Sequence, residues 1–327
     1  MAILVTGGAG YIGSHMVAEL INRGMEAVVL DNLVKGHRSS VWQGAKFYEG
    51  DMQDTQLLDQ IFTQNQITAV IHFAAYSIVP ESVANPAMYY HNNVVGTLAL
   101  LNGMLRHGVK NIVFSSTASV YGMPKTLPIT EETPTAPMSP YGESKLAIEK
   151  MLKWFSQAYD MRYMALRYFN VAGAHESGLI GEDHDPETHL IPIVLQVAQG
   201  KREVLDLFGS DYPTPDGTCI RDYIHVMDLV DAHILAMQSL ENGGSSAVYN
   251  LGSGTGFSNM EIVEAAKKIT GINFAVNMAG RRAGDPPELI AQCEKIKKEL
   301  GWNPTRTNMD NIIRTAWAWH SKTHIQK

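Results

Sequence analysis

Tyr141 and Lys145 lie four residues apart and are the strongest candidates for proton-transfer chemistry in the sequence. They follow Ser139 and Pro140, a pair typical of the start of a helix, so both side chains should lie on one helical face. An ammonium close to a phenol favours the phenolate and lowers the phenol pKa toward the range of a general base. We therefore predict that Tyr141 is a base assisted by Lys145; the alternative is a chance pair on a helix surface.

A glycine-rich turn follows the first apolar run, with Gly7, Gly10 and Gly13 directly before a helical pattern. Glycine allows a tight turn and a close approach to a pyrophosphate, which the N–H groups at a helix N-terminus attract. Asp31 follows 18 residues after Gly13, at the end of the second apolar run, where a carboxylate can accept both ribose hydroxyls. The same carboxylate would repel a 2′-phosphate. The turn therefore predicts a dinucleotide site that binds NAD rather than NADP.

Hydroxyl side chains follow the apolar run at residues 112–115, with Ser115 and Thr117 at its carboxyl end. Doubly wound sheets bind their ligands at the carboxyl ends of the strands. A hydroxyl at this place, such as that of Thr117, can reach the tyrosine. Serine and threonine are also ordinary loop formers after a strand, so this prediction depends on the two signals above.

Short apolar runs alternate with longer helical patterns over the first 170 residues. Runs without polar alternation predict strands covered on both faces, at residues 3–5, 27–30, 69–73 and 112–115, while residues 89–107 have helical spacing. The sequence thus predicts an α/β fold, with a doubly wound parallel, Rossmann-type sheet in a dinucleotide domain of residues 1–170. Residues 171–327 predict a smaller, mixed α/β C-terminal substrate domain. That boundary is soft, and later segments can return to the first domain.

Composition narrows the classes of function. With 45% hydrophobic and 18% charged residues among 327, we expect a globular chain. A net charge of −7 without a basic run argues against nucleic acid as a partner. Cys219 and Cys293 lie outside any Cys-x-x-Cys pair and predict neither a disulfide framework nor a cysteine-based zinc site. With no leader or membrane-length apolar stretch, we expect a cytoplasmic protein.

Taken together, these motifs resemble the UDP-glucose 4-epimerases, a family of extended short-chain dehydrogenases. The glycine turn and the Thr117, Tyr141 and Lys145 set define the superfamily. Residues 166–170 (Leu-Arg-Tyr-Phe-Asn), 221–226 (Arg-Asp-Tyr-Ile-His-Val) and 281–286 (Arg-Arg-Ala-Gly-Asp-Pro) point to the epimerases. The resemblance covers nearly the whole chain.

The resemblance implies two sets of binding residues. The NAD set is Gly7, Gly10, Tyr11, Ile12, Gly13, Asp31, Asn32, Asp51, Met52, Phe73, Ala74, Ala75, Ser77, Asn92, Ser115, Lys145 and Phe169. The set for the UDP-sugar is Thr117, Tyr141, Asn170, His189, Leu190, Phe208, Arg221, Arg282, Asp285 and Leu289. Guanidinium forks suit a diphosphate, which agrees with the two arginines.

The implied activity is that of an isomerase in galactose metabolism, which interconverts UDP-glucose and UDP-galactose with tightly held NAD. Tyr141 would take the C4 hydroxyl proton while the C4 hydride passes to the nicotinamide, and Thr117 would bond to the same oxygen. A 4-keto sugar would rotate and receive the hydride on its other face. The resemblance also suggests a homodimer.

Three alternatives remain open. A nucleotide-sugar 4,6-dehydratase needs an acid, and relatives carry Asp-Glu after the threonine where this chain has Ala118 and Ser119. Another nucleotide-sugar 4-epimerase, specific for UDP-N-acetylglucosamine, shares the same motifs. A non-catalytic dinucleotide-binding regulator would keep the glycine turn but would not need Tyr141 and Lys145.

Three local features qualify the resemblance. The best-known members carry a lysine where Ser77 stands, and members limited to unacetylated sugars carry a tyrosine where Leu289 stands. Residues 181–189 concentrate carboxylates and imidazoles, but they have no helical His-x-x-x-His spacing. We therefore predict no metal there and expect a solvated loop over the sugar pocket.

Overall fold

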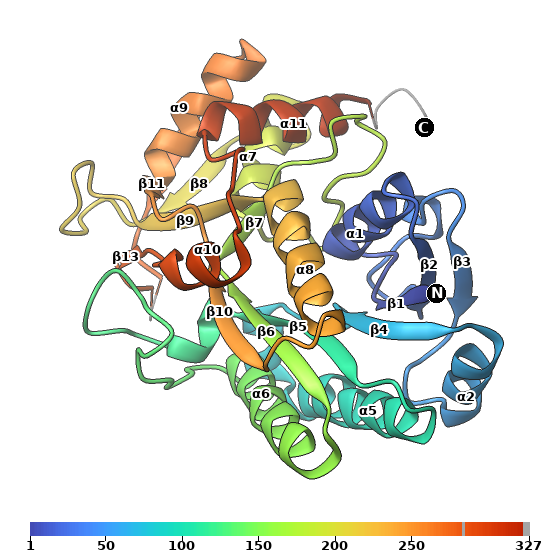
Figure 1. Ribbon diagram of the computed structural model, residues 1–327. Coiled ribbons are helices and arrows are strands. Elements are labelled where there is room, and N and C mark those ends of the chain that lie inside the picture. The colour runs from blue at the N-terminus through green and yellow to red at the C-terminus, as the bar shows by residue number, and fades with distance from the viewer. Residues whose placement is uncertain (283–284, 323–327) are drawn as a thin grey trace.

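A seven-stranded parallel sheet forms the centre of the computed structural model, which describes residues 1–282 and 285–322 (Figure 1). The strand order is β10-β6-β5-β4-β1-β2-β3, and every neighbouring pair is parallel. This order confirms the predicted doubly wound fold. The strands are β1 (Ala2–Thr6), β2 (Glu26–Asp31), β3 (Lys46–Glu49), β4 (Ile67–His72), β5 (Asn111–Thr117), β6 (Arg162–Tyr168) and β10 (Ala247–Leu251).

Helices cover both faces of this sheet because side chains alternate between its faces along each strand. In β1, Ile3 and Val5 pack with α1 and α8, whereas Ala2 and Leu4 pack with α2, α5 and α6. The helices of the first layer are α1 (Tyr11–Asn22) and α8 (Val226–Glu241); those of the second are α2 (Thr55–Gln64), α5 (Gly96–Arg106) and α6 (Pro140–Tyr159). Both faces of β1 are therefore shielded from water, as its unbroken apolar run predicts.

The helix predicted at residues 89–107 is not one regular helix. The short helices α3 (Val79–Ala84) and α4 (Pro86–Tyr89) come first, and a π-helical segment, η2 (Tyr90–Val95), leads into α5. Such π segments are rare and often lie at functional sites. Two 3-10 turns, η1 (Arg38–Ser40) and η3 (Ala118–Tyr121), follow β2 and β5.

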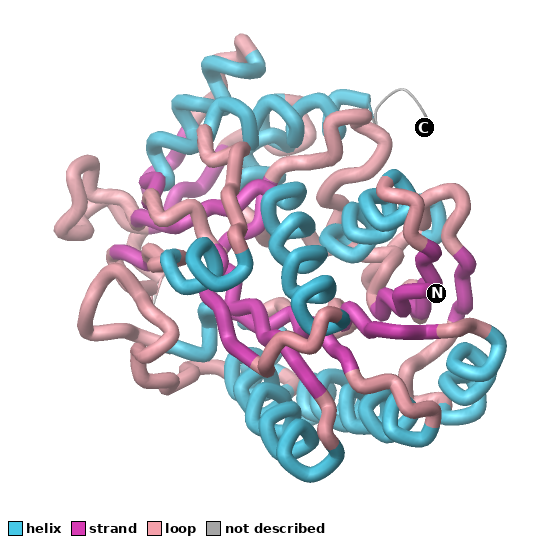
Figure 2. The backbone as a smooth tube through the Cα atoms, viewed as in Figure 1, coloured by secondary structure: helices cyan, strands magenta, loops and turns pink. Residues whose placement is uncertain are grey.

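A second region lies beside the carboxyl ends of the large sheet, and loops make up much of it (Figure 2). Its strands are β7 (Asn170–Ala172), β9 (Ile220–His225), β11 (Gly256–Ser258) and β13 (Glu288–Leu289), with a separate pair, β8 (Leu205–Phe208) and β12 (Val276–Ala279). Three helices pack together there: α7 (Leu190–Ala198), α9 (Asn259–Thr270) and α11 (Met309–Lys322). The remaining helix, α10 (Glu294–Leu300), packs through Ile296 on the core of the large sheet.

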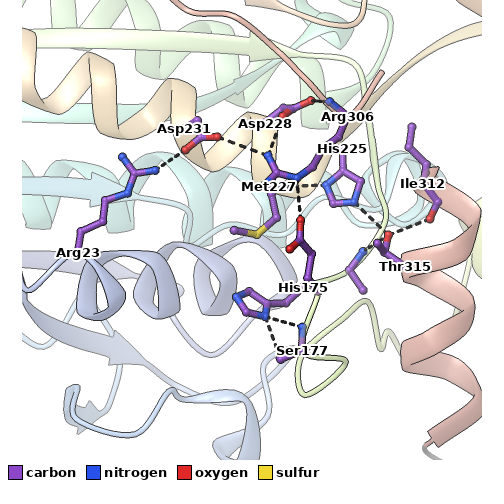
Figure 3. Close-up of polar contacts among 12 residues, drawn as sticks. Arg23, His175, Ser177, His225, Met227, Asp228, Asp231, Arg306, Ile312 and Thr315 are labelled. Atoms are coloured by element: carbon purple, nitrogen blue, oxygen red, sulfur yellow. Dashed lines mark hydrogen bonds and ion pairs between the residues drawn. The ribbon is translucent and has the colours of Figure 1, made fainter. Parts of the chain in front are cut away.

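The chain crosses between the two regions more than once. After β9 it forms α8 and β10, and β10 pairs with β6 at the edge of the large sheet. A polar network also connects the regions (Figure 3): Arg306 Nη1 donates to Asp228 Oδ1 in α8 at 3.1 Å, and Arg306 Nε donates to Glu176 Oε1 at 3.3 Å. His225 Nε2 and Thr315 Oγ1, in α11, share a hydrogen bond of 3.0 Å. These contacts join α8 and the loop after β7 to α11 and the segment that precedes it.

No helix in the described ranges is long and apolar enough to cross a membrane.

Candidate active site

The carboxyl ends of the parallel strands open into a cavity of about 380 Å³. Every residue of the predicted NAD set lines this cavity, and so do Thr117, Tyr141, Asn170 and His189 of the substrate set. Segments far apart in the sequence meet here because parallel strands end at one edge of the sheet. The structure therefore brings together the glycine turn, the acid of β2 and the tyrosine-lysine pair.

The glycine turn after β1 has a backbone shape that leaves space for the pyrophosphate of a dinucleotide. Gly7 adopts φ +73°, and a Cβ on it would lie 2.6 Å from the backbone N of Ala74. A Cβ on Gly13 would lie 2.0 Å from the carbonyl oxygen of Gly7, so neither position tolerates a side chain. No side chain of the described residues caps the N-terminus of α1 at Gly10. The N–H groups at this helix end can thus receive a pyrophosphate, and the site fits a dinucleotide.

Asp31 ends β2 at the rim of the cavity and is 8% exposed. Its Oδ2 accepts a hydrogen bond from the Ala9 N–H at 2.9 Å, and its Oδ1 accepts one from the Leu33 N–H at 2.8 Å. Burial raises the pKa of Asp31, and these two backbone donors oppose the rise. They also fix the orientation of the carboxylate, whose oxygens each retain a lone pair for a ribose hydroxyl.

Helix α6 begins as predicted. Pro140 is its first residue, and the Ser139 side chain accepts a hydrogen bond from the Gly142 N–H at 3.2 Å. Tyr141 and Lys145 therefore lie on the first turns and both line the cavity. Lys145 is 2% exposed, and its Nζ donates to the Ser115 carbonyl oxygen at 2.7 Å.

The electrostatics of the pair differ from the prediction. Burial raises the pKa of Tyr141, and the hydroxyl of Thr117 opposes that rise. Burial also lowers the pKa of Lys145 to about 7, against the pull of the Glu149 carboxylate. The expectation that Lys145 lowers the pKa of Tyr141 is therefore wrong for the protein's own groups, because burial is the largest influence on both pKa values.

Tyr168 also lines this cavity, and motif analysis did not single it out as a site residue. It is the last residue of β6, and its hydroxyl shares a hydrogen bond with Ser115 Oγ. Burial raises the pKa of Tyr168, and the nearby Tyr141 raises it further. The sequence signal that could have identified Tyr168 was its position within residues 166–170, the Leu-Arg-Tyr-Phe-Asn segment.

A buried ion pair supports the floor of the site. Arg167 Nε donates to Glu149 Oε1 at 2.9 Å, and Arg167 Nη2 lies 2.5 Å from Glu149 Oε2. Ser116 Oγ donates to the same Glu149 carboxylate at 2.5 Å. Arg167 Nη1 also donates to the Tyr121 hydroxyl at 2.9 Å. This network joins β6, the end of β5, the η3 turn and α6, the elements that carry Thr117 and Lys145.

The segment at residues 181–189 forms another wall of the cavity. The expected solvated loop is wrong for two of its carboxylates, since the side chains of Glu182 and Glu187 are only 5% and 3% exposed. His189 is half exposed, but its Nδ1 faces these buried groups. Although burial opposes both shifts, the facing charges lower the pKa of Glu182 and raise that of His189.

The rest of the substrate set lies outside the main cavity. Leu190 lines a small adjoining pocket with Asn170 and His189. The remaining members are not among the described residues that line either cavity: Phe208, Arg221, Arg282, Asp285 and Leu289.

Those five residues lie near one another instead. The Arg282 guanidinium stacks on the Phe208 ring at 4.0 Å, and Arg221 Nη2 lies 3.7 Å from Asp285 Oδ1. Pairing of β13 with β9 places Leu289 beside Arg221. The link to the cavity is Asn170, whose Nδ2 donates to the carbonyl oxygen of residue 222 in β9 at 3.1 Å.

Leu289 is joined to the catalytic end of the molecule through a small apolar cluster. It is partly buried and packs on the buried residues Val120, Tyr121, Ile129 and Leu146, on which Ala118 and Phe169 also pack. Ala118 follows Thr117 directly, and Phe169 lines the main cavity. Leu289 therefore shares an apolar cluster with a neighbour of Thr117 and with a residue of the cavity wall.

Comparison with known proteins agrees with this geometry. The model of the NAD dependent epimerase/dehydratase family matches residues 3–252. The UDP-glucose 4-epimerase of Streptococcus mutans is 56% identical over 98% of this chain and 97% of its own length. That of Lacticaseibacillus casei is 55% identical, with the same two shares. A solved UDP-glucose 4-epimerase from Brucella ovis, in complex with NAD, is 48% identical with a TM-score of 0.95, and the match covers 97% of each chain. The chain therefore belongs to the NAD dependent epimerase/dehydratase family, among the UDP-glucose 4-epimerases.

Proposed function

We propose that this chain is an isomerase that interconverts UDP-glucose and UDP-galactose by NAD-dependent 4-epimerisation. The observation that carries the proposal is the meeting, in one cavity, of the glycine turn and Asp31 with Thr117, Tyr141 and Lys145. A dinucleotide bound at the glycine turn and Asp31 would place its nicotinamide near Thr117, Tyr141 and Lys145. The family to which the chain belongs supports the same activity.

The cofactor contacts follow from the residues that line the cavity. The turn at Gly7 and Gly13 receives the pyrophosphate, and Asp31 accepts the adenosine ribose hydroxyls. The buried carboxylate of Asp31 selects NAD because a 2′-phosphate would bring a second anion beside it. When bound, NAD supplies an acceptor and donor for the C4 hydride and a positive ring that favours the Tyr141 phenolate.

Tyr141 is the base in this mechanism. Its phenolate takes the proton of the C4 hydroxyl, Thr117 donates a hydrogen bond to the same oxygen, and a 4-keto sugar results. Lys145 is held at the end of β5 by the Ser115 carbonyl, so its ammonium stays close to the base. Since burial raises the pKa of Tyr141, positive charge near the phenol is needed to keep it ionised at neutral pH.

The nucleotide part of the substrate is proposed to bind in the second region. This region belongs to the predicted UDP-sugar domain of residues 171–327, from which α8, β10 and α10 return to the large sheet. The arginines at positions 221 and 282 offer guanidinium forks that suit a diphosphate. Asn170 and His189 line both the catalytic cavity and the small adjoining pocket, which Leu190 also lines, and Asn170 bonds to β9 beside Arg221. Because the diphosphate is the anchored part, the keto sugar can rotate and present its other face for reduction.

The alternatives are less well supported. Ser119 lines the cavity at a place where a dehydratase needs a carboxylic acid, and a hydroxyl is a poor acid for expelling water. A binding protein without activity would not need a buried lysine held beside a tyrosine. UDP-N-acetylglucosamine remains a second candidate substrate, because Leu289 lacks the ring and hydroxyl of the tyrosine that excludes acetamido sugars.

The proposal extends to assembly and location. We expect a homodimer in the cytoplasm, as the family resemblance suggests, and both cysteines are free and buried, as suits a reducing compartment. Sedimentation of the purified chain at the mass of two subunits would agree with the dimer. A monomer at working concentration would contradict it.

The decisive experiment for the activity needs no added cofactor. The purified protein is incubated with UDP-galactose alone, and the products are separated by chromatography. We expect UDP-glucose to accumulate, because tightly held NAD is regenerated in each turnover. If no UDP-sugar is converted, even after NAD is added, the proposal is wrong.

A further inference from the structure

Four side chains with metal-binding atoms meet in the loop between β7 and α7. Glu182, His184, Glu187 and His189 each offer one ligand atom, and these four atoms all lie within 4.8 Å of one another. The two carboxylates are buried, whereas the side chains of His184 and His189 are 28% and 53% exposed. The set therefore has a buried acidic side and an imidazole side open to solvent.

The distances within the set match those between the ligands of a tetrahedral ion. His189 Nδ1 lies 2.7 Å from Glu182 Oε1 and 3.4 Å from Glu187 Oε1. His184 Nδ1 lies 3.2 Å from Glu182 Oε1 and 3.8 Å from Glu187 Oε2. Zinc bonds of about 2.0–2.2 Å in tetrahedral geometry place neighbouring ligand atoms about 3.3–3.6 Å apart. The observed distances of 3.2, 3.4 and 3.8 Å are close to that range, and the pair at 2.7 Å would move apart to admit an ion.

The orientation of His184 is a second, independent observation. Its Nδ1 is buried and has no hydrogen-bond partner within the part of the chain that the structure describes, although a carboxylate oxygen lies 3.2 Å away. An imidazole that is bonded to a carboxylate directs its ring nitrogen at that oxygen. This nitrogen is close to the carboxylates, and when the ring carries its proton on Nε2 the Nδ1 lone pair can bind a cation placed between them.

The geometry points to a Zn²⁺ site formed by Glu182, His184, Glu187 and His189, and we propose that this ion fastens the loop that forms one wall of the cofactor cavity. Mixed imidazole and carboxylate ligands suit zinc, whereas Mg²⁺ and Ca²⁺ prefer oxygen ligands alone. Four protein ligands close the coordination sphere, which is typical of a structural site. The proposal does not depend on the sugar substrate.

The consequence concerns the shape of the cavity. Glu182, His184 and His189 all line it, and His189 immediately precedes α7. An ion bound to all four side chains would join residue 182, within the loop, to residue 189 at its end, and so hold this wall in place. Sequence spacing did not predict the site because the ligands come from an irregular loop rather than from one helical face.

The test compares zinc binding by the full chain and by two variants. After treatment with a chelator and dialysis, the protein is titrated with ZnCl₂, and bound metal is measured by elemental analysis and competition with a chromogenic chelator. We expect one zinc per chain and a higher unfolding temperature with zinc, since a ligand that binds only the folded state stabilises it. His184→Ala and Glu187→Gln should each weaken zinc binding at least tenfold, in line with the 10–100-fold effect of removing even an outer-sphere partner.

A matched control is available on the surface. His107 lies 2.8 Å from a single carboxylate, that of Asp59, far from the loop in the second helical layer. His107→Ala should therefore bind zinc like the parent chain. Cobalt(II) added in place of zinc should give the intense visible absorption of a tetrahedral ion in the parent and lose it in His184→Ala.

Three results would overturn the proposal. One is less zinc than one ion per two chains at saturation; another is equal zinc affinity in the parent and in both variants. The third is an unchanged unfolding temperature on addition of zinc, which would show that protonated imidazoles alone balance the carboxylates. Circular dichroism of each variant without metal establishes that it is folded, and Glu187→Gln keeps the test valid if His184→Ala is not.

Discussion

The ammonium of Lys145 donates a 2.7 Å hydrogen bond to the backbone carbonyl of Ser115, joining the second turn of α6 to the end of β5. The same Nζ lies 4.9 Å from the centre of the Phe114 ring. Lys145 is therefore fixed in a dry place, where burial lowers its pKa to about 7. The ammonium is therefore positioned to act on the base, but burial makes its charged form unfavourable.

The first prediction concerns the cofactor. The protein as purified should release NAD or NADH on denaturation, because a 2′-phosphate beside the buried Asp31 carboxylate would be repelled. Asp31→Asn should retain less NAD and discriminate less against NADP. The measurement is chromatography of the released nucleotides, with the exposed Asp59→Asn as a control. Recovery of mainly NADP from the parent protein would contradict the role of Asp31.

The second prediction concerns the base. Tyr141→Phe keeps the ring but removes the group that takes the proton, and a general base contributes about 10²- to 10⁴-fold. Turnover of UDP-galactose should fall by at least that factor, while NAD stays bound. Tyr159→Phe, an exposed tyrosine on the same helix, should leave the rate unchanged. Turnover near the parent rate in Tyr141→Phe would move the role elsewhere, first to Thr117.

The third prediction concerns the charge beside the cofactor. Ser77 lines the cavity where the best-known members of the family carry a lysine. Lys145 should therefore supply more of the positive charge that stabilises the Tyr141 phenolate. Lys145→Met should reduce turnover by more than about tenfold, which corresponds to about 1.4 kcal/mol. The control is Lys150→Met, one turn further on and exposed. A smaller loss in Lys145→Met would show that another group supplies the charge.

The fourth prediction follows from the lowered pKa of Lys145. Between pH 7 and 10.5 the unfolded chain binds a proton that the folded chain has lost, so the free energy of unfolding should rise with pH in this window. The expected slope is about 1.4 kcal/mol per pH unit for one proton. Urea unfolding at two pH values within the window, after cofactor removal, measures it. The rise should be smaller in Lys145→Met by that amount; equal slopes would place the titrating group elsewhere.

The fifth prediction concerns substrate breadth. Leu289 is partly buried against the cluster of Val120, Tyr121, Ile129 and Leu146, so part of its surface already serves packing. We expect good activity on UDP-galactose and weaker but detectable activity on UDP-N-acetylgalactosamine. Leu289→Tyr should suppress the second reaction selectively, because a bulkier side chain clashes only with the acetamido group. Kinetics of both proteins on both sugars decide the matter; equal losses on the two substrates would make Leu289 an ordinary packing residue.

Much of the catalytic end of the molecule could be predicted from local patterns. Apolar runs such as residues 27–30 predict buried strands, and Asp31 lies at a strand end simply because the run stops there. Tyr141 and Lys145 share a helical face because their spacing and the Ser139-Pro140 start are properties of one short segment. Such features depend on hydrogen bonds and side-chain directions within a few residues of each other.

Contacts between distant segments could not be predicted in this way. Three features depend on how separate elements pack: the apolar cluster shared by Leu289 and Phe169, the buried Glu149–Arg167 pair, and the convergence of the Glu182 and His184 side chains. The break of the predicted helix by the π segment at residues 90–95 also required the folded chain.

The pKa of Tyr141 shows the difference most clearly. The spacing to Lys145 predicts an attraction that would favour the phenolate, and that spacing is correct. The fold then buries both side chains, and loss of water raises the pKa of the phenol while lowering that of the ammonium. Spacing along the chain specifies which groups are neighbours, but desolvation is set by everything packed around them, and here it is the larger effect.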